Sequence, residues 1–319
     1  MIVDGIRKMK ILFTGGSSFT GSWFIKALSA AGHEVVAVFT GSGPEDYPPD
    51  TTRGQRVGQL LDCCRPRFGH CFGDESFLKL IREQGDLSLL CHHAADVTNY
   101  KSPDFDVHGA VARNTLNLPW VLEALGEVGC RRIVLTGSVF EGHEGRGHEG
   151  IHFSPYGLSK SITAEIFAYY CSRSGQRLGK FVIPNPFGPY EELRFTRHLV
   201  GSWFTGTVPT VGSPDYIRDN IHVSLLALAY GRFVETLPDE GGFSRINPSG
   251  YAESQGAFAR RFAAEMDRRL DCDCRVELAK QSDFSEPLER VNIDQLDPED
   301  YGWSQSTAWD ELADYYLAQ

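Results

Sequence analysis

Long apolar runs are missing from this sequence, and so is any surplus of basic residues. No stretch approaches the roughly 20 apolar residues that a membrane span needs, and residues 1–10 are too mixed and charged for the core of a signal peptide. The formal net charge of −11 argues against the basic face that nucleic-acid binders use. These absences predict a cytoplasmic protein with no membrane and no nucleic-acid partner. They leave room for an anionic small ligand held by a few local arginines.

The cysteines lack the spacing of a metal site. Cys63, Cys64, His70 and Cys71 lie within nine residues, but no CxxC pair occurs and no matching pair lies elsewhere. In a cytoplasmic protein the eight cysteines are expected to be free thiols. We therefore predict no bound metal ion.

An alternation of apolar strands and helices runs through the first half of the chain. The 319 residues, of which 41% are hydrophobic and 23% charged, are enough for a substantial core. The expected strands cover residues 10–14, 34–39, 87–91, 132–136 and 179–183. The expected helices cover residues 22–31, 50–64, 75–84, 110–127 and 154–172. This order predicts an α/β fold with a doubly wound parallel sheet.

A glycine-rich turn joins the first strand to the first helix. Its sequence, TGGSSFTG over residues 14–21, fits the pattern TGxxGxxG with Ser18 in place of the middle glycine. In such a turn the backbone approaches a pyrophosphate and the helix N-terminus offers free N–H groups. The alternative is an ordinary tight loop, but the position after the first strand favours a dinucleotide. We predict contacts from Thr14, Gly15, Ser17, Ser18, Phe19 and Gly21.

The second strand is not followed by the acidic residue that usually holds the ribose 2′-hydroxyl of NAD. Thr40 and Ser42 stand there instead, and can hydrogen-bond a 2′-phosphate with Arg53 or Arg56 as a partner. Thr40 is thus a predicted cofactor contact. The cofactor is NAD or NADP, and this loop favours NADP slightly.

The pattern changes after residue 183. Turn-rich segments at 185–190 and 209–214 alternate with helical stretches at 195–205, 222–235, 252–270 and 308–318. We predict a dinucleotide-binding Rossmann domain over residues 9–183, to which residues 215–238 return. Residues 184–214 and 239–319 are expected to form a smaller, interleaved substrate-binding lobe.

The segment SPYGLSK, residues 154–160, contains a tyrosine and a lysine four positions apart. Ser154 can cap a helix and Pro155 suits its first turn, so Tyr156 and Lys160 lie on one helical face. The charge of Lys160 is expected to lower the pKa of the phenol. A tyrosine so tuned passes a proton to or from a sugar hydroxyl or ketone while a nicotinamide handles the hydride. A plain surface pair is the alternative.

A serine hydroxyl stands at the end of the strand over residues 132–136, where ligands of open α/β sheets gather. Ser138 lies eighteen residues before Tyr156 and is expected to bond the same sugar oxygen, with Thr136 a weaker candidate. An ordinary turn residue is the alternative. We predict Ser138, Tyr156 and Lys160 as catalytic residues, and Lys160 also as a contact of the cofactor ribose.

Taken in order, these motifs resemble the extended short-chain dehydrogenase/reductases, the family of nucleotide-sugar epimerases, dehydratases and ketoreductases. The resemblance covers nearly the whole chain. Besides the glycine turn and Ser138, Tyr156 and Lys160, it rests on CHHAA at 91–95, Thr115-x-Asn117-Leu118, NPFGP at 185–189, RDNIHV at 218–223 and Gly302-Trp303.

The resemblance implies further site residues by position. His93, Ala94 and Ala95 would line the cofactor, and Asp74 would lie near its adenine. For a nucleoside-diphosphate sugar as substrate, Asn185 would contact the nucleotide, Arg218 would grip the diphosphate, and Arg290 would be a second phosphate contact. The resemblance also implies a homodimer through the helices expected at 110–127 and 154–172.

The function implied is NAD(P)-dependent hydride transfer at a sugar carbon, most simply C4, by an epimerase or a ketoreductase. Sugar 4,6-dehydratases of the family carry Thr-Asp-Glu near the serine. Here residues 136–141 read TGSVFE, and Glu141 stands too late to serve as that base, so a dehydratase is the lower alternative. A non-catalytic NAD(P)-binding sensor or RNA-associated protein is another, but such relatives typically lose the tyrosine or the lysine.

Overall fold

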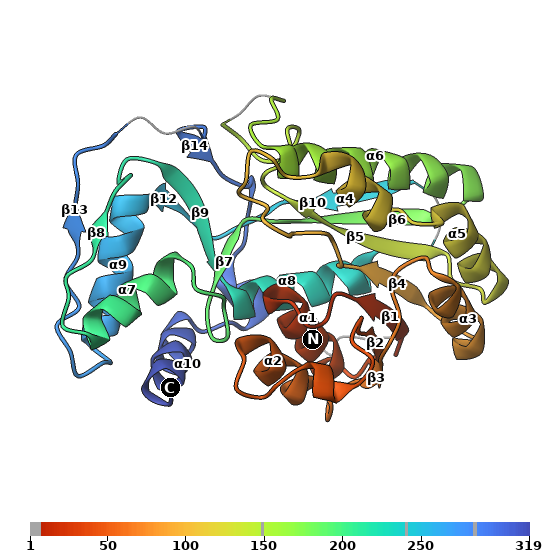
Figure 1. Ribbon diagram of the computed structural model, residues 1–319, viewed down its shortest axis with the longest axis horizontal. Helices are drawn as coiled ribbons and strands as arrows, with labels where there is room; N and C mark the ends of the chain where they lie inside the picture. The colour runs from red at the N-terminus through yellow and green to blue at the C-terminus, as the bar shows by residue number, and fades with distance from the viewer. Residues whose placement is uncertain (1–7, 148–149, 240–241, 283–285) are drawn as a thin grey trace.

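A parallel sheet forms the centre of the larger part of the molecule (Figure 1). The computed structural model describes residues 8–147, 150–239, 242–282 and 286–319. Within these ranges seven strands lie in the order β10-β6-β5-β4-β1-β2-β3, all parallel to their neighbours. They are β1 (Lys10–Thr14), β2 (Glu34–Val38), β3 (Arg65–Arg67), β4 (Leu89–His92), β5 (Arg132–Ser138), β6 (Arg177–Ile183) and β10 (Phe243–Ile246). The predicted doubly wound α/β sheet is confirmed.

Helices cover both faces of this sheet because alternate residues of its strands are apolar on opposite sides. On β1, Ile11 and Phe13 pack against one face and Leu12 against the other. The first face carries α1 (Phe19–Ala30), α2 (Thr52–Leu60) and α8 (Val223–Thr236). The second carries α3 (Glu75–Gln84), α5 (Leu118–Glu127) and α6 (Pro155–Ser174), with α4 (Val107–Asn114) beside α6. Figure 1 shows α6 on one side of the sheet and α1 and α8 on the other.

The helix expected over residues 110–127 is two helices. The chain breaks between α4 and α5 at Asn117, whose φ of +50° is left-handed, and Pro119 opens the first turn of α5. Apolar residues at helical spacing continue across the break, so the periodicity alone does not reveal it.

The rest of the chain forms a lobe beside the sheet, seen to the left in Figure 1. Strand β9 (Ile217–His222) pairs with β7 (Asn185–Phe187), β12 (Tyr251–Ser254) and β14 (Glu289–Arg290). Shorter pairs join β8 (Thr210–Val211) to β13 (Glu277–Leu278) and β11 (Pro248–Ser249) to β15 (Asp294–Gln295). The helices are α7 (Phe195–Phe204), α9 (Gln255–Asp267) and α10 (Gln305–Leu317), with 3₁₀ turns η1 (Pro44–Asp46) and η2 (Pro298–Tyr301) elsewhere.

An aromatic core holds the lobe together, and Trp309, Phe258 and Phe262 are almost completely buried in it. Two of its elements depart from the expectations. The helix expected over 252–270 begins only at Gln255, after strand β12, and β10 from the segment 239–319 lies in the main sheet. In the part of the chain that the structure describes, no helix is long and apolar enough to cross a membrane.

Candidate active site

The carboxyl edge of the sheet brings the ends of β1 and β4 into direct contact. The Thr14 Oγ1 atom lies 2.9 Å from His92 Nδ1, and the Ala94 amide donates to the same hydroxyl over 3.2 Å. Burial lowers the pKa of His92 to about 3, with Lys160 as a further cause. The imidazole is therefore neutral, and it joins the two strand ends as a hydrogen-bonding group rather than as a charge.

The glycine turn is closed by its own hydrogen bonds. Ser18 caps α1, because its Oγ accepts from the Gly21 amide at 3.2 Å and donates to the Gly15 carbonyl at 2.8 Å. A Cβ on Gly21 would lie 2.3 Å from the Gly15 oxygen, and one on Gly15 would lie 2.7 Å from the Ala94 nitrogen. Only glycine suits these two positions. The turn keeps bare backbone at a helix N-terminus, which fits the pyrophosphate of a dinucleotide.

Substituting Gly15 provides a test of this turn. Gly15→Ala is expected to weaken NADH binding by about tenfold or more, because the added Cβ would lie 2.7 Å from the Ala94 nitrogen and push the turn away from β4. Isothermal titration measures the dissociation constant. Gly32→Ala is the matched control, because Gly32 also has positive φ (+88°) but open space around it. Equal NADH affinity in the Gly15 and Gly32 variants would contradict the assigned role of the turn.

His93 is held between the glycine turn and β5. Its Nδ1 lies 2.9 Å from Thr136 Oγ1, and its Nε2 lies 3.0 Å from Ser18 Oγ and 3.1 Å from Thr20 Oγ1. Desolvation lowers the pKa of His93 to about 3, and Lys160 adds to the effect. With both ring nitrogens engaged, the neutral imidazole fixes the turn against the sheet. If His93 contacts the cofactor as predicted, it does so with the face of its ring, because both ring nitrogens are already hydrogen-bonded.

A cavity of about 840 Å³ opens at the ends of β2 and β4. Three predicted cofactor residues, Thr40, Ala94 and Ala95, line it together with Phe72 and the 96–106 segment. Asp74 does not line it. Instead, the Asp74 carboxylate caps α3, accepting from the Phe77 amide at 2.7 Å and from the Cys71 amide at 3.1 Å. The structure therefore gives Asp74 a local capping role beside the expected adenine position.

The two arginines considered for a 2′-phosphate differ in their surroundings. Arg56 is buried, pairs with Glu192 at 2.7 Å and donates to the Ser17 carbonyl at 3.2 Å. It also lies over the buried Phe19 ring, 6.0 Å from its centroid. Arg53 is exposed and donates to Ser17 Oγ over 2.9 and 3.1 Å. Of these two arginines, Arg53 is the one whose charge can reach a ligand on the turn.

Ser138, Tyr156 and Lys160 meet where β5 ends and α6 begins. Ser154 caps α6 through the Gly157 amide at 3.1 Å, which directs the first turn toward β5. The Lys160 ammonium donates to the Thr136 carbonyl at 2.7 Å. The Ser138 side chain lies near enough to the Tyr156 hydroxyl to lower the pKa of the phenol. The helix expected over 154–172 thus presents Tyr156 and Lys160 to one strand end.

The electrostatics of Tyr156 differ from the expectation. Desolvation raises the pKa of the phenol above its ordinary value, with Glu141 and Tyr100 adding to the rise and the Ser138 hydrogen bond opposing it. Burial also lowers the pKa of Lys160 to about 8, which Glu141 opposes and Lys180 reinforces. The expected lowering of the tyrosine pKa by Lys160 is wrong, because desolvation raises it. Burial outweighs the neighbouring charge, and the ammonium is bonded to a backbone oxygen.

Aromatic rings surround the Tyr156 side chain. Ring centroids of Tyr100, Phe105 and Phe140 lie 5.4, 5.9 and 5.8 Å from that of Tyr156, all in edge-on arrangements. These contacts hold the ring in place, while the Tyr156 side chain stays partly exposed.

The three predicted substrate residues come together in the lobe. Arg218 on β9 and Arg290 on β14 are register neighbours, and both donate to the same Glu286 oxygen, at 3.1 and 3.2 Å. Arg290 Nη1 lies 3.4 Å from the Asn185 Oδ1 atom, and its guanidinium lies 4.0 Å from the Phe140 ring centroid. Burial lowers the pKa of Arg290 to about 10. Two buried arginines therefore lie side by side, and Arg290 adjoins the turn over residues 138–141 through Phe140.

Sequence reasoning missed a buried ionic cluster beneath this turn. Glu141 Oε2 and Glu144 Oε1 lie 2.5 and 2.7 Å from the Lys180 ammonium, and Glu141 Oε1 accepts from the Ser138 amide at 2.8 Å. The only signal for it in the sequence was a lysine inside an otherwise apolar strand, at the middle of RLGKFVI.

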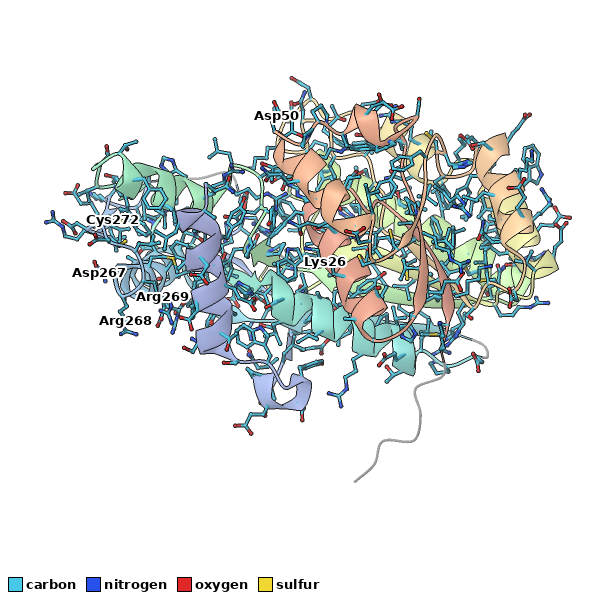
Figure 2. All side chains as sticks on the ribbon, turned by 90° about the horizontal axis from the view of Figure 1, so that it is seen from below. Lys26, Asp50, Asp267, Arg268, Arg269 and Cys272 are labelled. Carbon is cyan, nitrogen blue, oxygen red and sulfur yellow. The ribbon has the colours of Figure 1, made fainter. Side chains whose placement is uncertain are left out.

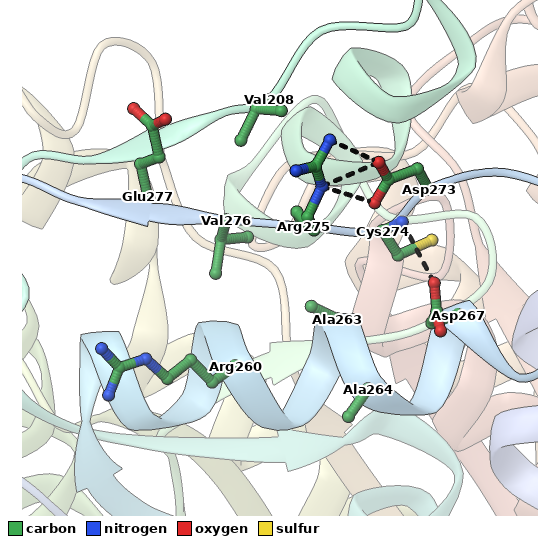
Figure 3. Close-up of a pocket in the computed structure, with 10 residues that line it drawn as sticks. All are labelled: Val208, Arg260, Ala263, Ala264, Asp267, Asp273, Cys274, Arg275, Val276 and Glu277. Atoms are coloured by element: carbon green, nitrogen blue, oxygen red, sulfur yellow. Dashed lines mark hydrogen bonds and ion pairs between the residues drawn. The ribbon is translucent and has the colours of Figure 1, made fainter.

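A second cavity, of about 520 Å³, lies in the lobe between α9 and the 273–277 segment (Figure 3). Part of its polar lining is paired internally, since Arg275 bonds Asp273 and Asp267 accepts from the Cys274 amide at 3.3 Å. Figure 2 shows Asp267 and Cys272 far from Lys26 on α1, toward the end of the molecule away from the sheet. In the described ranges no group of three or more His, Cys, Asp or Glu side chains is placed to hold a metal ion.

Known proteins share both the sequence pattern and the fold. A dTDP-glucose 4,6-dehydratase of Actinoplanes is 27% identical over 94% of this chain and 97% of its own length. The structure of UDP-glucuronic acid 4-epimerase from Bacillus cereus, with UDP-glucuronic acid and NAD, superposes with a TM-score of 0.72 at 19% identity, covering 97% of this chain and 99% of that one.

A dTDP-glucose 4,6-dehydratase from Streptomyces venezuelae, with NAD bound, superposes with a TM-score of 0.71 at 16% identity, covering 98% of each chain. The model of the NAD dependent epimerase/dehydratase family matches residues 11–242, which include the glycine turn and Ser138, Tyr156 and Lys160. The resemblance found in the sequence is thereby confirmed, and the chain belongs to the NAD dependent epimerase/dehydratase family.

Proposed function

We propose that this protein catalyses NAD(P)-dependent hydride transfer at C4 of a nucleoside-diphosphate sugar, as a 4-epimerase or a 4-keto reductase. The observation that carries the proposal is the position of Ser138, Tyr156 and Lys160. They lie on the strand edge that also carries the glycine turn, and Phe140 beside them contacts Arg290. A sugar held by its diphosphate at the arginines therefore has its ring near the phenol.

In this proposal Tyr156 moves the proton of the reacting sugar hydroxyl, and Ser138 holds the same oxygen by a hydrogen bond. Lys160 holds the ribose of the dinucleotide and supplies a positive charge near the phenol. The bound nicotinamide supplies the chemistry of hydride exchange. Because the pKa of Tyr156 is raised in the free protein, the phenol is protonated at neutral pH, which is the form that donates a proton to a keto sugar.

The cofactor is NAD or NADP. The UDP-glucuronic acid 4-epimerase and the Streptomyces dehydratase named above contain NAD. The exposed Arg53 beside Ser17 is the feature of this chain that suits a 2′-phosphate. We propose a dinucleotide-binding domain over 9–183, completed by α8 and β10, and a substrate lobe from the remainder of 184–319. The predicted return of 215–238 to the first domain then holds for α8 alone, because β9 pairs with the lobe strands β7, β12 and β14.

A 4,6-dehydratase is the second candidate because of the Actinoplanes relative. Water loss needs a carboxylate that is free to take a proton from the sugar. Glu141, the acidic residue nearest the serine, has one oxygen on the Ser138 amide and the other on Lys180. A carboxylate held in this way is a poor base, which favours epimerisation or reduction.

Product analysis tests the proposal. The purified protein is incubated with NAD and UDP-glucose, UDP-glucuronic acid or dTDP-glucose, and with NADPH and a dTDP-4-keto sugar, and ¹H NMR follows the products. The expected product is a C4 epimer or a reduced 4-hydroxyl. A 4-keto-6-deoxy product would establish the dehydratase instead, and no turnover of any of these sugars would contradict the proposal.

We also propose a homodimer through α5 and α6. Trp120, Ile162 and Tyr169 on these helices are exposed, as expected of a surface that a second copy covers. Sedimentation velocity tests the association state, and a monomer at micromolar concentration would contradict the dimer.

A further inference from the structure

Three ionisable side chains are buried together beneath the turn over residues 138–141. Glu141, Glu144 and Lys180 are 1%, 3% and 6% exposed. Lys180 bridges the two carboxylates, and Glu144 also accepts from Asn247 Nδ2 at 2.8 Å. Burying charges costs several kcal/mol for each ion unless the geometry compensates. Because the cluster is costly to bury and lies beneath the candidate active site, its role is expected to lie with the neighbouring site residues.

Gly137 makes room for the cluster. A Cβ at this position would lie 2.8 Å from Lys180 Cε and 3.0 Å from Glu141 Oε1. The ion pair therefore occupies the space of the missing side chain. The residues on either side of Gly137 are Thr136, whose carbonyl accepts from Lys160, and Ser138, whose amide donates to Glu141. The Glu141–Lys180 ion pair thus lies beneath Thr136 and Ser138, the two residues of β5 next to α6.

Charged groups face Lys160 from two strands. Glu141 follows β5 and Lys180 is on β6, and they act on the Lys160 ammonium with opposite sign. From β4, His92 and His93 are neutral because desolvation lowers the pKa of each to about 3. Tyr156, one turn earlier on α6, is uncharged at neutral pH because its pKa is raised. Glu141 lies beside Gly137, next to the Thr136 carbonyl that accepts from Lys160, and is the negative charge that acts on this buried ammonium.

We infer that Glu141 is a positioning residue that holds the Ser138 turn through its amide and keeps Lys160 protonated against the charge of Lys180. The inference rests on the proposed function, because that function requires a positive charge on Lys160. In the proposed function Lys160 has to carry its proton in order to hold the ribose. Its pKa of about 8 means that the ammonium is present below that pH and is lost above it.

NMR titration of the free protein tests this inference without any sugar or cofactor. The chain has eight lysines, so labelling lysine with ¹³C at Cε gives few signals, and Lys160→Arg assigns the one of interest. Glu141→Gln is expected to lower the titration midpoint of Lys160 by about one pH unit or more. Lys180→Met is expected to raise it, and the double variant should return it close to the wild-type value.

Glu144→Gln is the matched control, since it removes a buried carboxylate from the same lysine but not from the Ser138 amide. Its effect on the Lys160 midpoint should be smaller. An unchanged midpoint in Glu141→Gln, or equal shifts in both glutamine variants, would overturn the inference. If Glu141→Gln does not fold, Lys180→Met decides alone, and a midpoint that stays or falls refutes the proposed balance of charges.

The proposed function can fail separately. If the wild-type protein turns over no nucleotide sugar but the midpoints move as described, the electrostatic role of Glu141 stands and hydride transfer to a sugar is refuted. If turnover is found and the midpoints do not move, the function stands and the role of Glu141 falls.

Discussion

Replacement of Tyr156 by phenylalanine is expected to lower kcat about 100- to 10,000-fold, the usual contribution of a positioned acid–base group. The variant loses only the hydroxyl, while its ring keeps the edge-on contacts with Tyr100, Phe105 and Phe140. The dissociation constant for the dinucleotide should therefore change little. Steady-state kinetics with the sugar identified by product analysis, together with calorimetric titration of NADH, measures both quantities.

Tyr100 offers a matched control for this experiment. The Tyr100 ring packs edge-on against the Tyr156 ring, with centroids 5.4 Å apart. Tyr100→Phe removes an equivalent atom close by and should leave kcat within a few-fold of the wild type. Turnover by the Tyr156 variant at the wild-type rate, or equal losses in the two variants, would end the assignment of Tyr156 as the acid–base group.

Features that depend on adjacent residues could be predicted from the sequence. The spacing of Ser154, Tyr156 and Lys160 defines a capped helix with two side chains on one face, and the structure places both at the end of β5. The alternation of apolar runs likewise predicted the parallel sheet. In each case the physical cause, a cap or a helical repeat, acts within a few residues of the chain.

Features that depend on distant residues could not be predicted. Glu141 and Lys180 are 39 positions apart, and their pairing follows only from the neighbouring positions of β5 and β6. The raised pKa of Tyr156 has the same origin, since burial by rings from other segments dominates it. Edge strand β3 reads Arg-Pro-Arg, which carries no apolar signal because one side of an edge strand faces outward.

Replacement of Arg218 by alanine is expected to raise KM for the nucleotide sugar about 10- to 100-fold, because hydrogen bonds to a charged group contribute about 1.5–3 kcal/mol. In the free protein the guanidinium donates to Glu286 at 3.1 Å and lies 4.5 Å from the Tyr216 ring centroid. A phosphate oxygen would take the place of the Glu286 carboxylate as the acceptor for the Arg218 guanidinium. The dissociation constant for NADH should not change, since the glycine turn lies on another element.

Arg261 is the matched control because it has the same kinds of partner on the neighbouring strand. It pairs with Glu253 at 2.7 Å and lies 5.1 Å from the Tyr251 ring centroid, but it is 42% exposed. Arg261→Ala should leave KM near its wild-type value. Glu286→Gln sharpens the test, since it removes the carboxylate that competes for Arg218 and Arg290, and KM should then fall. A rise in KM for the Glu286 variant, or loss of NADH affinity without a change in KM for Arg218→Ala, would show that these arginines do not hold the diphosphate.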